Sequence, residues 1–451
     1  MTTLHPLQTT DNLRAAYERY LKAIYPFQDT RLRERFWAGL AEDDRLVKGP
    51  LLEASPPYET GPSIGQLVDE GLLTAGFRKL CASTTRLPLD RPLYVHQARA
   101  VTHVVGGSGH NLVVATGTGS GKTESFLIPI IDHLLREEAA GTLARPGVRA
   151  LLLYPMNALA NDQLARLREL LERYPAITYG RYTGETLEER DKALDAFRER
   201  ERRDPPPNEL LSRAAMREAP PHILLTNYAM LEYLLLRPQD TELFDGPTGG
   251  HWRFIVADEA HVYDGATGIE VGMLLRRLRD RVLRGGRGLR CIATSATLGR
   301  GEQDFPAAAH FAGTLFDEPF EASDVFAAVR RAPADLGKIW GDSSPELIAA
   351  LTGAAAGPDD DEPGAAGKIV QIAAAHGVPP SVAAAAGRRA DGSAALYEIL
   401  RGDGRLRRLQ TQLAEGPQLL VDMARSLFPD LAPEAAREAA ATLGLAGIHT
   451  E

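Results

Sequence analysis

The chain has 451 residues, of which 44% are hydrophobic and 25% charged, a balance typical of a globular protein long enough for about two or three domains. Its net charge of -9 argues against a protein that coats nucleic acid by bulk electrostatics, so a polyanion would have to bind at a local basic site. The only two cysteines, Cys81 and Cys291, exclude a disulfide framework and a thiolate zinc site, and both are expected to be small core residues.

The first 92 residues form the first of three predicted regions. The start, MTTLHPLQTTDNLRAAYERY, has no apolar segment of signal length, and no window of the chain reaches the roughly 20 apolar residues that span a bilayer. A cytoplasmic protein without a membrane partner is therefore expected. Amphipathic helical patterns around an irregular stretch, KGPLLEASPPYETGPS, predict a helical accessory region over residues 1–92.

Residues 93–320 alternate short apolar runs with helical patterns. The expected buried strands are LVVA (112–115), ALLLYP (150–155), ITYGRY (177–182), HILLTN (222–227), FIVAD (254–258) and CIATSA (291–296). Between them, stretches such as SFLIPIIDHLLREEAA repeat apolar residues at helical spacing. This alternation predicts an α/β fold: a parallel sheet with helices on both faces, in which ligands bind beyond the carboxyl ends of the strands.

A glycine-rich segment, TGTGSGKTE (116–124), follows the first of these strands and precedes a helix. Its glycines let backbone N–H groups converge, and the helix amino terminus adds partial positive charge, so the segment is predicted to cradle the phosphates of ATP. Lys122 would reach the β- and γ-phosphates, and the Thr123 hydroxyl would ligate Mg²⁺. The strict pattern has glycine where Thr116 stands, but the flanking strand and helix support the site. The predicted nucleotide-binding residues here are Thr116, Gly117, Thr118, Gly119, Ser120, Gly121, Lys122 and Thr123.

Two carboxylates, Asp258 and Glu259, end another apolar strand in the run DEAHVYD (258–264). At the carboxyl edge of a parallel sheet, Asp258 would join Thr123 in the coordination shell of Mg²⁺, and Glu259 would act as the base that orients the attacking water. Lys122, Asp258 and Glu259 are thus the predicted catalytic residues. A zinc site that combines His261 with Asp258 or Asp264 is disfavoured because the usual H-x-x-x-H spacing is absent.

Five segments resemble, in order, motifs I, Ia, Ib, II and III of the superfamily 2 DEAD/DEAH-box helicases. They are TGTGSGKTE, YPMNALANDQ (154–163), LLTNYAMLEYLL (224–235), DEAH (258–261) and TSAT (294–297). The residues around YPMNALA and DEAH are similar to bacterial DNA helicases of the YprA type, often large proteins of DNA repair or phage defence. The resemblance implies a first RecA-like lobe that hydrolyses ATP and acts on nucleic acid. The preference for DNA over RNA rests on this resemblance alone.

The resemblance also implies roles for residues outside the phosphate loop. Gln97 matches the glutamine that reads adenine. Ser295 and Thr297, with His261 as their partner, match the motif that couples the nucleotide site to movement of a nucleic-acid strand. Sequence-independent contacts with the backbone of one strand are implied for Met156, Asn157, Thr183, Gly184, Thr226 and Asn227.

Two charged runs interrupt this region. RRLRDRVLRGGRGLR (276–290) carries seven arginines and one acid. It is interpreted as a solvated helix face followed by a loop, with a nucleic-acid track as the alternative. RERERRDPPPNE (198–209) combines mixed charge with three prolines and is expected to be an exposed excursion.

After about residue 320, alanine-rich helical patterns predict a third region over residues 321–451, with AAAGPDDDEPGAAG (354–367) as a flexible linker. Helicases of this superfamily close the ATP site with a second RecA-like lobe that brings arginines to the γ-phosphate. No such pattern follows residue 300, and GRRADG (387–392) is expected to be a surface loop. The chain is therefore expected to be completed by a second lobe, from a longer chain or from another subunit.

Two other functions remain open at this point. One is a nucleotide-binding regulatory or adaptor subunit of a multi-protein repair or defence complex, which would bind nucleotide without turnover stimulated by DNA. The other is a kinase or related phosphotransferase, against which TSAT and YPMNALA argue.

Overall fold

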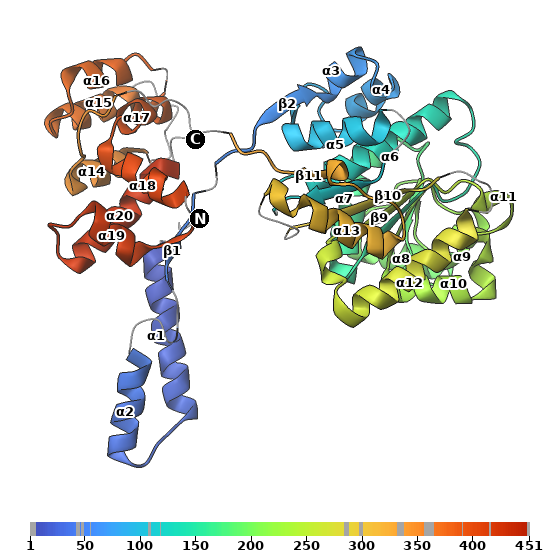
Figure 1. Ribbon diagram of the computed structural model, residues 1–451, viewed down its shortest axis with the longest axis horizontal. Helices are drawn as coiled ribbons and strands as arrows, with labels where there is room; N and C mark the ends of the chain where they lie inside the picture. The colour runs from blue at the N-terminus through green and yellow to red at the C-terminus, as the bar shows by residue number, and fades with distance from the viewer. Residues whose placement is uncertain are drawn as a thin grey trace. The chain divides into compact units, whose positions relative to one another are not determined.

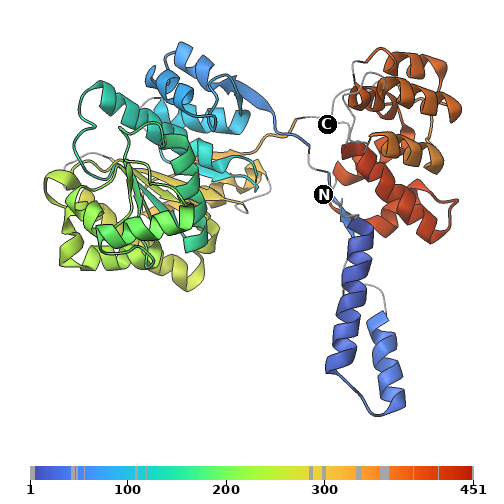
Figure 2. The same cartoon turned by 180° about the vertical axis from the view of Figure 1, so that it is seen from behind.

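A computed structural model describes residues 6–41, 46, 49–54, 56–106, 110–117, 119–283, 288–296, 301–331, 338–355, 365–389, 391–414 and 416–448. The chain divides into two compact units (Figure 1 and Figure 2). Unit 1 joins Met1–Pro56 with Ala332–Glu451, and unit 2 comprises Pro57–Arg331. The predicted division at residues 93 and 321 stays a prediction, and the contacts group residues 57–92 with unit 2.

Unit 2 is built on an eight-stranded parallel sheet with the strand order β11-β4-β10-β9-β5-β8-β6-β7. The strands are β4 (Leu112–Ala115), β5 (Ala150–Tyr154), β6 (Tyr179–Arg181), β7 (Glu209–Leu210), β8 (Ile223–Asn227), β9 (Phe254–Ala257), β10 (Arg290–Ser295) and β11 (Val325–Ala327). All six strands expected from the sequence form, and the short edge strands β7 and β11 are additional. The predicted α/β fold is confirmed.

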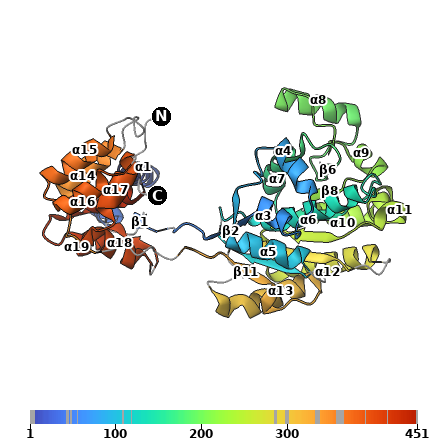
Figure 3. The same ribbon diagram turned by 90° about the horizontal axis from the view of Figure 1, so that it is seen from above.

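Alternate residues of each strand enter two separate apolar cores, as the two-residue period of a strand requires. Leu152 faces one core and Leu151 the other. The first core is covered by α3 (Ile64–Asp69), α4 (Gly76–Ser83), α5 (Val95–Val105), α6 (Lys122–Ala139) and α7 (Asn157–Leu171). The second is covered by α9 (Arg213–Glu218), α10 (Tyr228–Leu236), α12 (Gly265–Val282) and α13 (Phe305–Phe316). Figure 3 shows these helices around the sheet. Cys81 and Cys291 are buried in the cores, as predicted.

The run 198–209 differs from the expected exposed excursion. It starts in α8 (Arg190–Glu201), where Arg198 is solvent-exposed, but it ends in β7 with Asn208 and Glu209 buried. The Glu209 carboxylate accepts two hydrogen bonds of 2.7 Å from the buried Arg168 guanidinium. The charged residue at the end of the run therefore has a buried partner, which composition alone does not reveal.

The two ends of unit 2 lie beside each other. Tyr58 and Arg330 form an antiparallel bridge, and the Arg331 N–H donates to the Pro57 carbonyl at 2.8 Å. A two-stranded antiparallel ribbon, β2 (Thr60–Ser63) with β3 (Pro92–Tyr94), leads into α5. The sheet-containing unit is thus closed where the chain enters and leaves it.

Unit 1 is mainly helical and is assembled from both ends of the chain. Its helices are α1 (Pro6–Ile24), α2 (Thr30–Ala41), α14 (Pro345–Ala355), α15 (Ala365–Ala375), α16 (Pro380–Ala386), α17 (Gly392–Leu400), α18 (Gly404–Ala414), α19 (Leu420–Leu427) and α20 (Pro433–Ile448). Strand β1 (Leu51–Leu52) pairs antiparallel with β12 (Gln418–Leu419), and Arg437 lies 3.0 Å from Asp11. Amino-terminal and carboxy-terminal segments therefore form one unit.

Two predictions concern loops of unit 1. Most of the expected linker, residues 356–364, lies outside the described residues, while its ends belong to α14 and α15. In GRRADG, Arg389 donates to the Glu398 carboxylate of α17 at 3.1 Å. Within the described ranges, no helix combines the length and apolarity needed to cross a membrane.

Candidate active site

The predicted phosphate loop connects β4 to the amino terminus of α6. Gly119 and Gly121 have positive φ angles of 77° and 72°, a region that residues with a side chain rarely adopt. A Cβ at Gly121 would also lie 2.1 Å from the Gln97 side-chain nitrogen, whereas one at Gly117 would meet no atom within 4 Å. Thr118 lies outside the described residues. Glycine is thus required for the shape of the loop at residues 119 and 121.

Side chains hold the loop from inside and from α5. The buried Thr116 and Ser120 hydroxyls are 2.5 Å apart, and His96 Nε2 lies 2.9 Å from the Ser120 carbonyl. Gln97 donates its amide to the Gly121 carbonyl at 2.9 Å and accepts from the Tyr94 N–H at 2.8 Å. Burial lowers the pKa of His96, opposed by its bond to the Ser120 carbonyl. The adenine-reading role of Gln97 stays a prediction, while its observed contacts shape the loop.

Asp258 and Glu259 follow β9, as the sequence predicted. Asp258 is 7% exposed and accepts a hydrogen bond from the Thr294 hydroxyl of β10. Burial raises the pKa of Asp258, and the Thr294 bond opposes this shift. Glu259 has a left-handed backbone with φ of 50°, and its N–H donates to the Thr294 hydroxyl at 3.2 Å. A non-glycine residue in this region is strained, which is common at functional sites.

Lys122 and Glu259 connect the two motifs directly. Lys122 Nζ lies 2.6 Å from Glu259 Oε1, and the two side chains are 10% and 20% exposed. The second carboxylate oxygen, Oε2, is buried without a hydrogen bond from the described residues, and His261 Nδ1 lies 3.4 Å from it. His261 Nδ1 is also 3.2 Å from the Ser295 hydroxyl. Thr297 lies outside the described residues.

Thr123 is nearly buried at the first turn of α6. Its hydroxyl accepts from Arg166 Nη1 at 3.0 Å and lies 3.4 Å from the Gln163 amide, both on α7. The donor set nevertheless fits a nucleotide with Mg²⁺: a loop with two left-handed glycines before α6, one ammonium group, one buried carboxylate and one carboxylate oxygen without a hydrogen bond from the described residues. For the described residues, the only group of three or more metal-ligand side chains lies elsewhere, so the zinc alternative at His261 gains no support.

Two predicted nucleic-acid residues meet at the carboxyl ends of the neighbouring strands β5 and β8. Asn227 donates its amide to the Asn157 side-chain oxygen at 2.7 Å, and its own oxygen accepts from the Met230 N–H to cap α10. Asn157 in turn donates to Glu185 at 3.0 Å. Met156 beside them is 58% exposed.

The other residues predicted to contact a nucleic-acid strand differ in their solvent exposure. The Thr226 side chain is buried, and its hydroxyl donates to the Tyr182 carbonyl at 2.6 Å. Thr183 is buried as well, and its N–H donates to the Thr186 hydroxyl at 3.0 Å. Gly184 is exposed. Both threonines are fully buried in this arrangement, so neither presents a group to an external ligand here, and the predicted contacts stay predictions.

Residues 276–282 of the basic run form the end of α12, whereas Arg290 begins β10, and several of the helical arginines pair with acids of the protein. Arg279 lies 2.9 Å from Asp317, which Arg276 also approaches at 3.4 Å. Arg281 lies 2.6 Å from Asp245. Residues 284–287 lie outside the described residues. These ion pairs agree with a helix face that serves the fold.

His96 and Thr294 were not among the predicted site residues, although both support the site. His96 is adjacent to Gln97, and Thr294 begins the TSAT segment, so their positions next to matched motifs were the available signal. Their roles depend on contacts across 24 and 36 residues of sequence, which spacing does not encode.

A family model described as DEAD/DEAH box helicase matches residues 94–305. The chain is similar to "Druantia protein DruE" of Escherichia coli (strain UMEA 4076-1), with 33% identity over 377 residues, covering 64% of this chain and 20% of that protein. It is also similar to "Uncharacterized ATP-dependent helicase YprA" of Bacillus subtilis (strain 168), with 30% identity over 224 residues, covering 49% of this chain and 25% of that protein. The predicted likeness to the YprA type is confirmed.

Among solved structures, the chain is similar to the DUF1998 helicase MrfA bound to DNA, at 24% identity and a TM-score of 0.44, covering 65% of this chain and 34% of that one. The chain spans only 20% and 25% of the length of the two curated relatives above.

Proposed function

This chain contains a DEAD/DEAH box helicase domain of superfamily 2, and from this premise we propose that it is the motor lobe of a DNA helicase or translocase that binds and hydrolyses ATP. The observation that carries the proposal is the contact of Lys122 with Glu259. The two residues follow β4 and β9, whose carboxyl ends flank that of β10 in the sheet. The phosphate loop, Glu259 and the end of β10 thus lie together at the carboxyl edge of the sheet, where parallel sheets bind ligands.

Each residue of this edge has a role that its chemistry suits. A bound Mg²⁺ ion and nucleotide would supply the phosphoryl group and neutralise its charge. The N–H groups of residues 117–121 and the Lys122 ammonium would hold phosphate oxygens, and Thr123 and Asp258 would ligate the metal. Glu259 would hold the attacking water and accept its proton.

Coupling to nucleic acid is proposed through β10. The Thr116 N–H of the phosphate loop donates to the Ser295 carbonyl at 3.0 Å, and the Ser295 hydroxyl lies 3.2 Å from His261. One residue of β10 therefore touches both the loop and the DEAH segment. A change in either segment would shift Ser295, and this contact supports the coupling role proposed for Ser295, His261 and Thr297.

We further propose that a single nucleic-acid strand runs over the carboxyl ends of β5 and β8. The hydrogen-bonded pair Asn157 and Asn227 supports this path. The exposed Met156, which precedes Asn157, and the exposed Gly184, which follows Thr183, support it as well. Neutral amides and backbone groups would give binding without sequence preference. DNA as the substrate, repair or phage defence as the pathway and a cytoplasmic location are proposals that rest on the YprA-type resemblance and the composition. A second RecA-like lobe is the proposed partner.

The test is ATP hydrolysis by the purified chain with and without single-stranded DNA, with RNA of the same length as a comparison. We expect Mg²⁺-dependent ATP binding with slow turnover that DNA stimulates, because an arginine from a second lobe can be worth about 10³ to 10⁵ in rate. Glu259→Gln is the control that identifies this site as the source of turnover.

Three results would count against the proposal in different ways. A folded chain that binds no Mg²⁺-ATP would overturn the motor function itself. Rapid turnover that Glu259→Gln abolishes would contradict the need for a second lobe. Binding without any response to nucleic acid would favour the regulatory or adaptor subunit.

A further inference from the structure

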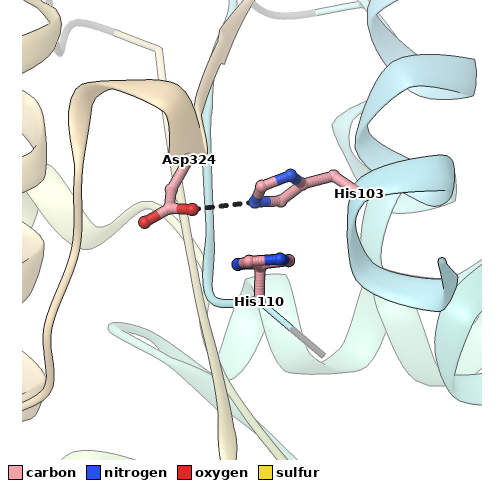
Figure 4. A group of neighbouring side chains, drawn as sticks. All are labelled: His103, His110 and Asp324. Atoms are coloured by element: carbon pink, nitrogen blue, oxygen red, sulfur yellow. Dashed lines mark hydrogen bonds and ion pairs between the residues drawn. The ribbon is translucent and has the colours of Figure 1, made fainter. Parts of the chain in front are cut away.

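Two histidines and one aspartate gather at the end of β4 that is opposite the phosphate loop. His103 lies on α5, His110 precedes β4 by two residues, and Asp324 ends the short helix η4 (Ala322–Asp324) before β11. Their ligand atoms all lie within 4.8 Å of one another. Figure 4 shows the three side chains facing one another, with His103 Nε2 2.8 Å from Asp324 Oδ1. The imidazole rings of His103 and His110 are 4.7 Å apart at an angle of 27°.

The surrounding backbone holds these residues in place. Asp324 is buried, and its second oxygen accepts the Glu321 N–H at 2.8 Å, so the carboxylate is fixed on the side away from the histidines. Next to His110, the Asn111 side chain accepts from the Cys291 N–H at 2.8 Å and donates to the Pro319 carbonyl at 2.9 Å. Supporting hydrogen bonds of this kind orient the ligands of metal sites.

From this geometry we propose that His103, His110 and Asp324 bind one Zn²⁺ ion, with water as the fourth ligand. Two imidazoles and a carboxylate form a mixed nitrogen and oxygen set that suits zinc, whereas Mg²⁺ and Ca²⁺ prefer oxygen ligands throughout. A tetrahedral zinc ion with bonds of about 2.1 Å holds its ligand atoms about 3.4 Å apart. Zinc binding would therefore widen the His103–Asp324 separation of 2.8 Å and shorten the larger separations, and the exposed His110 would have to move toward the ion.

The ion would join three segments that are far apart in sequence. Asp324 immediately precedes β11, an edge strand of three residues that pairs with β4 in the sheet. His103 belongs to the helix that carries His96 and Gln97 at its other end, where both contact the phosphate loop. Zinc bound here would stabilise the edge of the sheet and the position of α5, because an ion that binds only the folded chain favours folding.

The alternative is a simple ion pair between His103 and Asp324 with His110 packed on it. The test uses the full chain with any purification tag removed and metal stripped by a chelator. Zn²⁺ is titrated by calorimetry, and thermal unfolding is followed with and without Zn²⁺. We expect one Zn²⁺ per chain and a higher unfolding midpoint, and at least a tenfold loss of affinity in His110→Gln, a change at an exposed residue that leaves the His103–Asp324 pair intact.

Two further variants make the result specific. His310→Gln removes an exposed histidine of α13 outside the cluster and should bind Zn²⁺ like the unaltered chain. Asp324→Asn keeps an oxygen for the Glu321 N–H but offers zinc a weak ligand, so it should fold and lose affinity.

Co²⁺ in place of Zn²⁺ should give the intense visible absorption of a tetrahedral site in the unaltered chain and not in His110→Gln. Equal Zn²⁺ affinity of the unaltered chain and His110→Gln would overturn the proposal, and so would an equal loss in His310→Gln. None of the three readouts involves ATP, so the outcome is independent of the proposed motor function.

Discussion

Lys122 Nζ lies 2.6 Å from Glu259 Oε1, so the proposed phosphate ligand and the proposed base form an ion pair with each other. The pair joins residues separated by 137 positions and spans the end of an intervening strand. A phosphate that binds Lys122 competes with Glu259 for the same ammonium group. Removing the Lys122 ammonium should therefore lower nucleotide affinity, whereas removing the Glu259 charge should not lower it.

Lys122→Ala should lower the affinity for a non-hydrolysable ATP analogue at least tenfold, a loss of about 1.4 kcal/mol or more. Glu259→Gln should keep or raise that affinity, because a neutral amide competes less for Lys122, while hydrolysis falls about 10² to 10⁴-fold with loss of the base. Calorimetry and phosphate release on the two folded variants measure these effects. An equal loss of nucleotide affinity in both would contradict the assigned roles.

The Asn227 side chain has two contacts, and substitutions can separate them. Asn227→Ser keeps an oxygen that caps α10 but removes the amide that reaches Asn157, whereas Asn227→Ala also removes the cap, at a cost of about 1 kcal/mol. Both Asn227→Ser and Asn157→Ala should weaken binding of single-stranded DNA. The slope of log affinity against log salt should stay unchanged, because neutral amides release no counterions.

Fluorescence anisotropy of a labelled oligonucleotide at several salt concentrations measures both quantities. The expected slope corresponds to about two to four phosphate contacts, or roughly 1.5 to 3 units per decade of salt. If Asn157→Ala and Asn227→Ser bind single-stranded DNA with unaltered affinity, the proposed path of the nucleic-acid strand is wrong.

The arginines of α12 should affect stability more than nucleic-acid binding. Arg281 lies 2.6 Å from Asp245 and donates to the Leu235 carbonyl at 3.0 Å, so Arg281→Ala should lower the free energy of unfolding by about 1 kcal/mol. Arg277, which is exposed on the same helix, is the matched control and should change stability little. Replacing Arg276, Arg277 and Arg279 together should leave the salt slope of DNA binding unchanged. A smaller slope would place this helix on the nucleic acid.

His222 should make the stability of unit 2 depend on pH. Burial, together with the nearby Arg149 charge, lowers the pKa of His222 to about 4, and the neutral ring accepts the Thr178 N–H at 3.1 Å. Because the unfolded chain takes up the proton near the ordinary value of about 6.5, this contribution is complete above that pH and is lost as pH falls toward 4. The loss should reach about 3 kcal/mol.

Urea unfolding between pH 7.5 and 4 measures this loss. Replacing Trp37 and Trp340 by phenylalanine leaves the buried Trp252 as the fluorescent reporter of unit 2. The same series on His222→Asn, which offers an oxygen acceptor and does not titrate, should have a smaller dependence on pH. An identical dependence in both proteins would assign the effect to other groups.

The sequence predicted what is encoded locally. The strands before Thr116 and Asp258 are continuous apolar runs, and glycines permit the positive φ angles that a phosphate loop needs. The sheet and the edge that carries the site could therefore be predicted from local sequence patterns. β7 was missed because its Glu209 is charged and becomes a core residue only through Arg168, 41 positions away. The contact of His103 with Asp324 spans 221 positions, and no spacing rule applies to ligands that distant.

The discontinuity of unit 1 fixes the order in which the chain can fold as it is synthesised. All of unit 2 has been synthesised when the ribosome reaches residue 331, and its ends can pair through Pro57 and Arg331 without any later residue. Strand β1, by contrast, has to wait for β12, more than 360 residues later by the register of Leu51 with Leu419. Domains fold as units during synthesis, so unit 2 can fold first, and the amino-terminal segments wait for their partners at Leu419 and Arg437.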